Sequence, residues 1–361
     1  MSADPLARIP ERIPDERSEA RLLELRQEAE RRGRVEVRGV RPIGAPFPIA
    51  SSETGYYGIH LLKEPQWKPT VPFYFFAGGA AGASAVIGAV ADWLGKDAEL
   101  AQTARWVAAG GALLSSALLI EDLGRRSRFI NMLRVFKVQS PMSMGAWILA
   151  AFGAASTAAA FAKAAERRFG HMLPVSVIGG FSQFFSAMFG LPFHNYTGVL
   201  IGATAIPVWN RNIHTLPIHF GASGVQSSVS ILELLGYTDS RALNLLGIGS
   251  AVLETWEGYH LESRRDAALK PLKRGASGWT TRVGGVLSGP LPLALRLFGG
   301  QRMRKWAAIS GIAGSLLTRY GWMWAGRASA RDWRLPLEIP EHTAVIEEMQ
   351  SKPKLPQVKT A

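Results

Sequence analysis

Long runs of uncharged, mostly apolar residues alternate along this chain with short segments rich in arginine. A helix rises about 1.5 Å per residue and the hydrocarbon core of a bilayer is about 30 Å thick, so about 20 apolar residues are enough to cross it. The pattern predicts an all-α, polytopic transmembrane protein with about eight helical spans. The runs lie at residues 72–93, 102–121, 140–163, 176–207, 215–236, 241–261, 281–299 and 305–326.

The fourth run is longer than one straight span requires and contains a proline. Pro192 removes a backbone N–H donor and bends a helix that continues through it. We expect residues 176–207 to form one kinked span. The alternative is two short spans, which gives nine helices and moves the C-terminus to the other side of the membrane.

Polar segments flank the apolar runs and divide the chain into three parts. Residues 1–70 are expected to form a polar N-terminal tail, in which residues 15–34 are a short amphipathic helix. Residues 71–327 are the transmembrane domain. Residues 328–361 are polar and proline-rich, which is typical of a flexible tail.

The placement of basic residues explains the formal net charge of +13, so nucleic acid is not an expected partner. The loops after the second and the sixth run carry many of the arginines and lysines, and with eight spans these loops share one side of the membrane with both termini. Because basic loops stay in the cytoplasm, we expect a multi-pass protein of the plasma membrane (the cell inner membrane), with both termini cytoplasmic.

Cysteine is absent from the sequence, which limits the chemistry of the chain itself. Thiolates hold iron–sulfur clusters and many zinc sites, so we expect no cluster and no metal here. A haem held by two histidines needs them at matched depth on facing helices, and only His194 and His219 lie well within runs. We therefore expect no haem, and any redox centre belongs to a partner.

Small residues are dense in the first run. Gly78 and Gly82 have the spacing that lets helix backbones approach closely in lipid. This pattern predicts tight packing of the first span and by itself indicates nothing about chemistry.

Ionisable residues inside the apolar runs are candidates for chemistry, because a buried charge in a bilayer is costly unless it is paired or faces a cavity. Glu233, Glu254 and Arg319 lie deepest. Arg319 either forms an ion pair with a carboxylate such as Glu254 or polarises a bound headgroup. Carboxylates near the ends of runs are expected to turn outward to the membrane surface; these are Asp92, Asp122 and Glu257.

Four segments together resemble the NrfD family, the membrane subunits of polysulfide reductases. They occur in the family's order and are spread from about residue 55 to 333, across all predicted spans. They read GYYGIHLLKEPQWKPTVPFYFFAGGAAGAS from Gly55 to Ser84, YTGVLIGATAIPVW from Tyr196 to Trp209, LPIHFGASG from Leu216 to Gly224 and AGRASARD from Ala325 to Asp332.

The resemblance implies an integral membrane subunit of two four-helix bundles, without a redox centre of its own and not catalytic alone. Such a subunit exchanges electrons between a ferredoxin-like iron–sulfur protein and a membrane quinone, either menaquinone or ubiquinone. A molybdopterin oxidoreductase subunit is the second implied partner, as in polysulfide reductase or formate dehydrogenase.

Relatives place the quinone near the start of the first span, beside the end of the fourth. Tyr196 matches a family tyrosine that contacts quinone, whereas Tyr74 and Val71 stand where the best-known pattern has a histidine and an asparagine. A phenol donates a hydrogen bond but does not supply protons near neutrality as histidine does. The headgroup candidates, each of which also has a purely structural explanation, are Tyr74, His194, Tyr196, His219 and Arg319.

Four carboxylates are candidates for proton transfer if water connects them: Glu121, Asp122, Glu233 and Glu254. Ala203 stands where many similar sequences carry an acid, so a family proton route through that position is not carried over to this chain.

The predicted function is therefore a quinone-reactive membrane anchor of a multi-subunit oxidoreductase. Coupling of this function to proton movement is left open. Two alternatives remain. One is a secondary transporter or channel without a redox role, in which a broken helix such as the one at Pro192 is a common feature. The other is a structural anchor with a degenerate quinone site.

Overall fold

The computed structural model describes residues 62–95, 97–332 and 335, together with Glu24, Gln27, Glu28 and Arg31. It separates into two units, Met1–Ile59 and His60–Ala361. Within the described residues every regular element is helical and no strand occurs, which confirms the all-α prediction. The predicted helix at residues 15–34 lies outside the described residues except for the four named above, which are helical and exposed.

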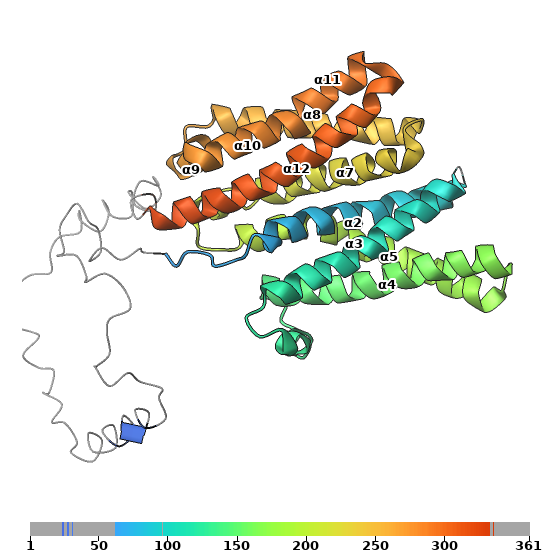
Figure 1. Ribbon diagram of the computed structural model, residues 1–361, viewed down its shortest axis with the longest axis horizontal. Coiled ribbons are helices and arrows are strands. Elements are labelled where there is room, and N and C mark those ends of the chain that lie inside the picture. The colour runs from blue at the N-terminus through green and yellow to red at the C-terminus, as the bar shows by residue number, and fades with distance from the viewer. Residues whose placement is uncertain are drawn as a thin grey trace, which may run out of the picture. The chain divides into compact units, whose positions relative to one another are not determined.

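Four long helices pack side by side and form what we term the first bundle (Figure 1). A short 3-10 segment, η2 (Arg126–Leu133), lies in the connection between its second and third helices. Each long helix is long and apolar enough to cross a membrane, so the first four predicted spans are confirmed as membrane-length helices. They are α2 (Thr70–Trp93), α3 (Ala98–Asp122), α4 (Pro141–Phe169) and α5 (Leu173–Gly202).

Local sequence fixes where these helices begin. At the start of α3, Asp97 Oδ1 accepts a hydrogen bond from the Leu100 N–H at 2.9 Å. At the start of α4, the Ser140 hydroxyl oxygen accepts one from the Ser143 N–H at 3.4 Å. Such caps satisfy backbone donors that the first turn of a helix leaves unpaired.

The fourth predicted run forms a single helix. Pro192 lies inside α5, which continues through it and ends at Gly202, before the predicted end at residue 207. The described chain therefore favours one span over two at this place. The next residues turn and form the short helix α6 (Pro207–Asn210).

The remaining long helices form the second bundle (Figure 1). Helix α7 (Thr215–Leu232) continues into a π-helical turn, η3 (Glu233–Tyr237). Short elements, η4 (Ala267–Leu269) and α9 (Lys270–Lys273), precede the last part of the bundle. The other members are α8 (Arg241–Ser263), α10 (Gly275–Ser288), α11 (Pro290–Phe298) and α12 (Gly300–Arg331).

The predicted seventh run is broken in the structure. Helices α10 and α11 are separated at Gly289, because Pro290 and Pro292 have no N–H to continue the hydrogen-bond ladder. Gly289 lies so close to α8 that an added Cβ would be 2.9 Å from Thr255 Oγ1. The Ser310 hydroxyl of α12 donates a hydrogen bond to the Leu287 carbonyl at 2.7 Å, which ties α12 to the segment beside the break.

Helices of the second bundle carry many buried polar and charged side chains, and these residues lower their hydropathy. Among the described helices, only α2 to α5 have both the length and the apolar character of a membrane span. The protein is a polytopic helical membrane protein, and the count of eight spans stays a prediction for its second half.

Close backbone contacts join α2 to its neighbours, as the small residues of the first run predict. A Cβ added at Gly82 would lie 2.7 Å from the Gly190 carbonyl of α5. A Cβ added at Gly79 would lie 3.4 Å from Gly224 Cα of α7. Helix α2 thus packs against both bundles and holds them together.

A buried tryptophan joins three segments at the end of the protein where α2 begins and α12 ends. Trp209 is fully buried, and its indole N–H donates a hydrogen bond to the Trp322 carbonyl at 2.9 Å. Its ring stacks on Trp67 with centroids 5.7 Å apart and planes 13° apart. Gly326 leaves room for the indole, because a Cβ there would lie 1.9 Å from Trp209 Cζ2.

We predict that Gly326→Ala destabilises the protein by about 1–3 kcal/mol, because the added methyl group overlaps a side chain that cannot move away. The measurement is the thermal-unfolding midpoint of the purified protein in mild detergent. The matched control is Gly110→Ala, an exposed helical position with nothing within 4 Å of the added Cβ, where the midpoint should hold or rise slightly. Equal midpoints for the two variants would contradict the prediction.

Candidate functional site

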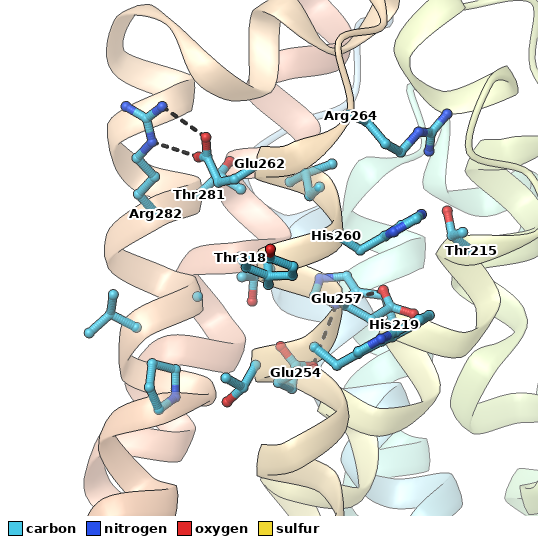
Figure 2. A pocket seen from close by; sticks show the side chains of 18 of the residues that line it. Thr215, His219, Glu254, Glu257, His260, Glu262, Arg264, Thr281, Arg282 and Thr318 are labelled. Atoms are coloured by element: carbon cyan, nitrogen blue, oxygen red, sulfur yellow. Dashed lines mark hydrogen bonds and ion pairs between the residues drawn. The ribbon is translucent and has the colours of Figure 1, made fainter.

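A cavity of about 410 Å³ lies among α7, α8, α10 and α12 in the second bundle (Figure 2). We term it the His219 pocket. It lies toward the end where the chain enters α7, because Asn212 and Thr215 line it. Its other polar lining residues are His219, Glu254, Thr255, Glu257, His260, Glu262, Arg264, Thr281, Arg282 and Thr318.

An imidazole between two carboxylates is the chemical centre of this pocket. Nδ1 of His219 lies 3.6 Å from Glu254 Oε1 and 3.6 Å from Glu257 Oε2. The carboxylates are three residues apart on α8, a spacing that places side chains on one face of a helix, while His219 comes from the facing helix α7. Figure 2 shows the three side chains together on the pocket wall.

Several polar atoms of this centre have no hydrogen-bond partner among the described residues. These atoms are both ring nitrogens of His219, Oε1 of Glu254 and Oε1 of Glu257. The other oxygen of Glu254 accepts a hydrogen bond from the Ser288 hydroxyl at 2.9 Å. Since buried polar groups are normally paired, the centre is suited to water or to a ligand with hydrogen-bonding oxygens.

Glu257 departs from its sequence-based prediction. We expected its carboxylate to turn outward to the membrane surface, but the side chain is only 12% exposed and faces His219. The interpretation as an outward-turned residue was therefore wrong for Glu257.

The mouth of the pocket has an ion pair and an aromatic surface. Arg282 of α10 donates to both carboxylate oxygens of Glu262 of α8, at 2.7 and 3.2 Å (Figure 2). Trp256 stacks on His260 with ring centroids 5.4 Å apart and planes 6° apart. Trp322 forms part of the wall, so flat apolar surfaces lie beside the polar centre.

Arg319 is fully buried close to the pocket but does not line it. It donates hydrogen bonds to the Phe220 carbonyl at 3.2 Å, to the Ser315 carbonyl at 3.1 Å and to the Ser223 hydroxyl. Its guanidinium carbon lies 5.0 Å from the centroid of the Phe220 ring. Its hydrogen bonds thus go to α7 and α12 rather than to Glu254.

The other predicted headgroup residues lie on helices of the first bundle and do not line the His219 pocket. Tyr74 is buried against the rings of Phe75 and Phe193, with centroids 5.5 and 6.5 Å away. Tyr196 is also buried, and its hydroxyl has no hydrogen-bond partner among the described residues. His194 is half-buried, with Nδ1 against the Leu191 carbonyl. None of the three lines the His219 pocket, although the His194 ring lies at the contact with α7, where a Cβ added at Gly221 would be 3.3 Å from His194 Nε2.

Glu121 and Asp122 lie at the exposed end of α3 and contact the residues that begin α2. Asp122 Oδ1 accepts a hydrogen bond from the Lys68 N–H at 2.9 Å, and the Glu121 carbonyl accepts one from Lys68 Nζ at 2.7 Å. The Glu121 carboxylate pairs with Arg126 at 2.5 Å. These contacts anchor the start of the first helix.

Glu233 forms a fully buried ion pair that the sequence analysis missed. Arg296 of α11 donates to its two oxygens, each at 2.7 Å, and both side chains are 0% exposed. Arg296 also reaches Asn244 Oδ1 at 3.3 Å. The sequence did contain a signal for this pair: Arg296 lies inside the predicted run at residues 281–299, and an arginine in an apolar run requires a partner inside the protein.

A row of buried polar side chains, which we term the polar seam, extends between α7 and α8 from the His219 pocket to this ion pair. The Ser250 hydroxyl donates to Gln226 Oε1 at 2.5 Å. Gln226 Nε2 and Ser230 Oγ have no partner among the described residues, and both face Gly311. The seam comprises His219, Gln226 and Ser230 of α7, Glu233 of η3, and Asn244, Ser250, Glu254 and Glu257 of α8.

The polar seam has a sequence signal. Its members on α7 and at the start of η3 recur at intervals of seven, four and three residues, which places them along one side of a helix. A stripe of this kind in an otherwise apolar helix indicates a polar interior rather than a lipid-facing surface.

Among the described residues no cluster of three or more histidine, aspartate or glutamate side chains could hold a metal ion.

The membrane-length helices and the polar seam define an integral membrane protein with a polar interior. Residues 63–242 match the family model described as polysulphide reductase, NrfD, and the chain belongs to this family. The family comprises quinone-interacting membrane subunits of oxidoreductase complexes. No curated protein matches the chain.

The matched region covers the first bundle and α7 and ends at the start of α8. His219 lies within it, whereas Glu254, Glu257 and Arg296 lie beyond it. The pocket is therefore built from one helix inside the family match and from three helices that follow it.

We predict that Glu233→Gln lowers the thermal-unfolding midpoint in detergent by roughly 10 °C, because it leaves Arg296 buried and unpaired at a cost of about 3–5 kcal/mol. The control is Glu254→Gln, which keeps a polar group for Ser288 and breaks no direct ion pair with a lysine or arginine, so its midpoint should fall much less. Replacing both partners, Glu233→Met with Arg296→Met, should recover most of the loss. A larger loss in Glu254→Gln than in Glu233→Gln would reverse this assignment.

Proposed function

We propose that this chain is the quinone-reactive subunit that connects a soluble iron–sulfur partner to the membrane, and that the quinone headgroup binds in the His219 pocket. The observation that carries the proposal is the imidazole of His219, which lies 3.6 Å from each of two carboxylates and has no hydrogen-bond partner on either nitrogen among the described residues. A cavity of about 410 Å³ is within the usual size of small-molecule sites.

The residues of the pocket have separate roles in this proposal. His219 hydrogen-bonds a carbonyl oxygen of the headgroup and passes a proton to it. Glu254 and Glu257 hold the imidazole and restore its proton, since carboxylates and histidine are the usual general acids and bases of proteins. Trp256 and Trp322 provide flat apolar surface for the ring of the quinone.

Reduction of a quinone to a quinol consumes as many protons as electrons. In the proposal the electrons come from the partner, and the protons arrive through pocket side chains. The polar seam supplies a route toward Glu254 from the opposite end of the second bundle, through Ser250, Gln226 and Ser230, where water completes the hydrogen-bonded chain. Glu233 lies at the far end of the seam, where its ion pair with Arg296 holds it in place.

The expected partners follow from the family. A ferredoxin-like iron–sulfur subunit docks at the end where α2 begins and α12 ends, and a molybdopterin oxidoreductase subunit completes the complex. The His219 pocket lies toward this end, because Arg264 on its wall donates a hydrogen bond to Asn212, which follows the buried Trp209. This end is cytoplasmic in a plasma-membrane protein with both termini inside, and the quinone is menaquinone or ubiquinone.

We predict that His219→Gln in the intact complex lowers the rate of quinone reduction about 100-fold, the usual contribution of one positioned acid–base group. The measurement is the steady-state rate with a soluble quinone, followed at the quinone absorbance. His171→Gln is the control, because His171 is exposed in the connection between α4 and α5 and its loss should leave the rate unchanged.

A third variant tests whether the quinone headgroup binds in the first or in the second bundle. Tyr196→Phe removes a hydroxyl that has no partner among the described residues of the first bundle. Normal rates in Tyr196→Phe with a loss in His219→Gln support the His219 pocket, and the reverse pattern moves the headgroup to the first bundle. Normal rates in both variants would favour a structural anchor.

We predict that the tagged protein, extracted from its native membrane in mild detergent, carries both a cluster-binding ferredoxin-like subunit and quinone. Mass spectrometry of the proteins and of the extracted lipids measures both. A protein recovered alone, without quinone and from membranes that contain such subunits, would contradict the redox function and favour transport.

A further inference from the structure

A second cavity, of about 570 Å³, lies where α9 and the start of α10 meet the end of α12. We term it the basic recess. Residues 275–277 and 327–332 on its walls lie just outside the predicted spans at 281–299 and 305–326. The recess therefore lies at the level where the membrane surface is expected.

Positive charge dominates the recess. Among the described residues that line it, one side chain, Asp332, is a carboxylate and four are cationic: Lys270, Arg274, Arg327 and Arg331. Arg331 pairs with Glu64 through two hydrogen bonds of 2.9 Å. Arg327 donates to the Trp67 carbonyl, a neutral group, and pairs with no carboxylate among the described residues. Arg274, at the start of α10, is exposed.

Exposed apolar side chains follow on α10, directly after the residues that line the recess. Trp279, Val283 and Val286 are 70%, 42% and 53% exposed. Their spacing of four and three residues places them on one side of the helix. Trp324 of α12, which lines the recess itself, is 42% exposed, and tryptophan is typical of the level where a membrane meets water.

We propose that the basic recess binds the phosphate headgroup of an anionic phospholipid, whose acyl chains lie along the exposed apolar side of α10. A cavity with surplus positive charge at the membrane surface attracts a phosphate, and basic pockets between helices on the cytoplasmic side bind acidic headgroups. The adjoining apolar stripe distinguishes a lipid from a soluble phosphate. This inference concerns a different cavity from the His219 pocket, although Val286 of the stripe also lines that pocket.

The test is native mass spectrometry of the full-length protein in detergent, titrated with phosphatidylglycerol. The wild-type protein should bind phosphatidylglycerol and not phosphatidylcholine at the same concentration. Arg274→Gln should weaken binding about fivefold, the contribution of one basic side chain near an anionic surface. The matched control is Arg302→Gln, an equal change of charge at an exposed position at the opposite end of α12, and it should bind like the wild type.

Three outcomes would overturn the proposal. Equal binding in Arg274→Gln and the wild type would remove the recess as the site, provided that both elute alike on size exclusion. Equal weakening in Arg302→Gln would indicate attraction by net charge alone. Displacement of phosphatidylglycerol by glycerol phosphate at equal concentration would assign the recess to a soluble phosphate, because the acyl chains would then contribute nothing.

Discussion

The cost of a charged group in an apolar interior governs the second half of this molecule. A buried guanidinium or carboxylate is tolerated only where a partner compensates it, and each one here has a fixed environment. Arg296 and Glu233 compensate each other directly. Arg319 distributes its charge over two carbonyls, a hydroxyl and an aromatic ring. In contrast, Glu254 and Glu257 lie beside the cavity and pair with no lysine or arginine among the described residues.

Much of the fold could be predicted because apolar runs and helix length are local properties of the sequence. The first four runs became four helices, and the small residues of the first run became the contact between α2 and α5. The break at Gly289 was missed because a hydropathy window averages over Pro290 and its neighbours. Hydropathy is a weaker guide in the second bundle, because the polar residues that point inward lower the average of each helix.

The partners of the buried charges could not be predicted, because they depend on the rotation of helices far apart in the sequence. Glu233 and Arg296 are separated by 63 residues, and nothing local to either indicates the other. Even on consecutive helices the pairing depends on helix rotation: Arg105, inside the second predicted run and only 4% exposed, pairs with Asp92 of α2 at 2.7 Å. The candidate acids were identified from their positions in the apolar runs. The contact of His219 with Glu254 and Glu257 was visible only in the structure.

The interruption between α10 and α11 has a mechanical consequence. Helix α10 borders both cavities, whereas α11 carries the arginine of the buried ion pair. A continuous helix would transmit a tilt at one end as strain at the other. Since the ladder of hydrogen bonds is interrupted by Pro290, the direction of α11 is not fixed by that of α10, so one helix lines the two cavities while the other carries Arg296 to Glu233.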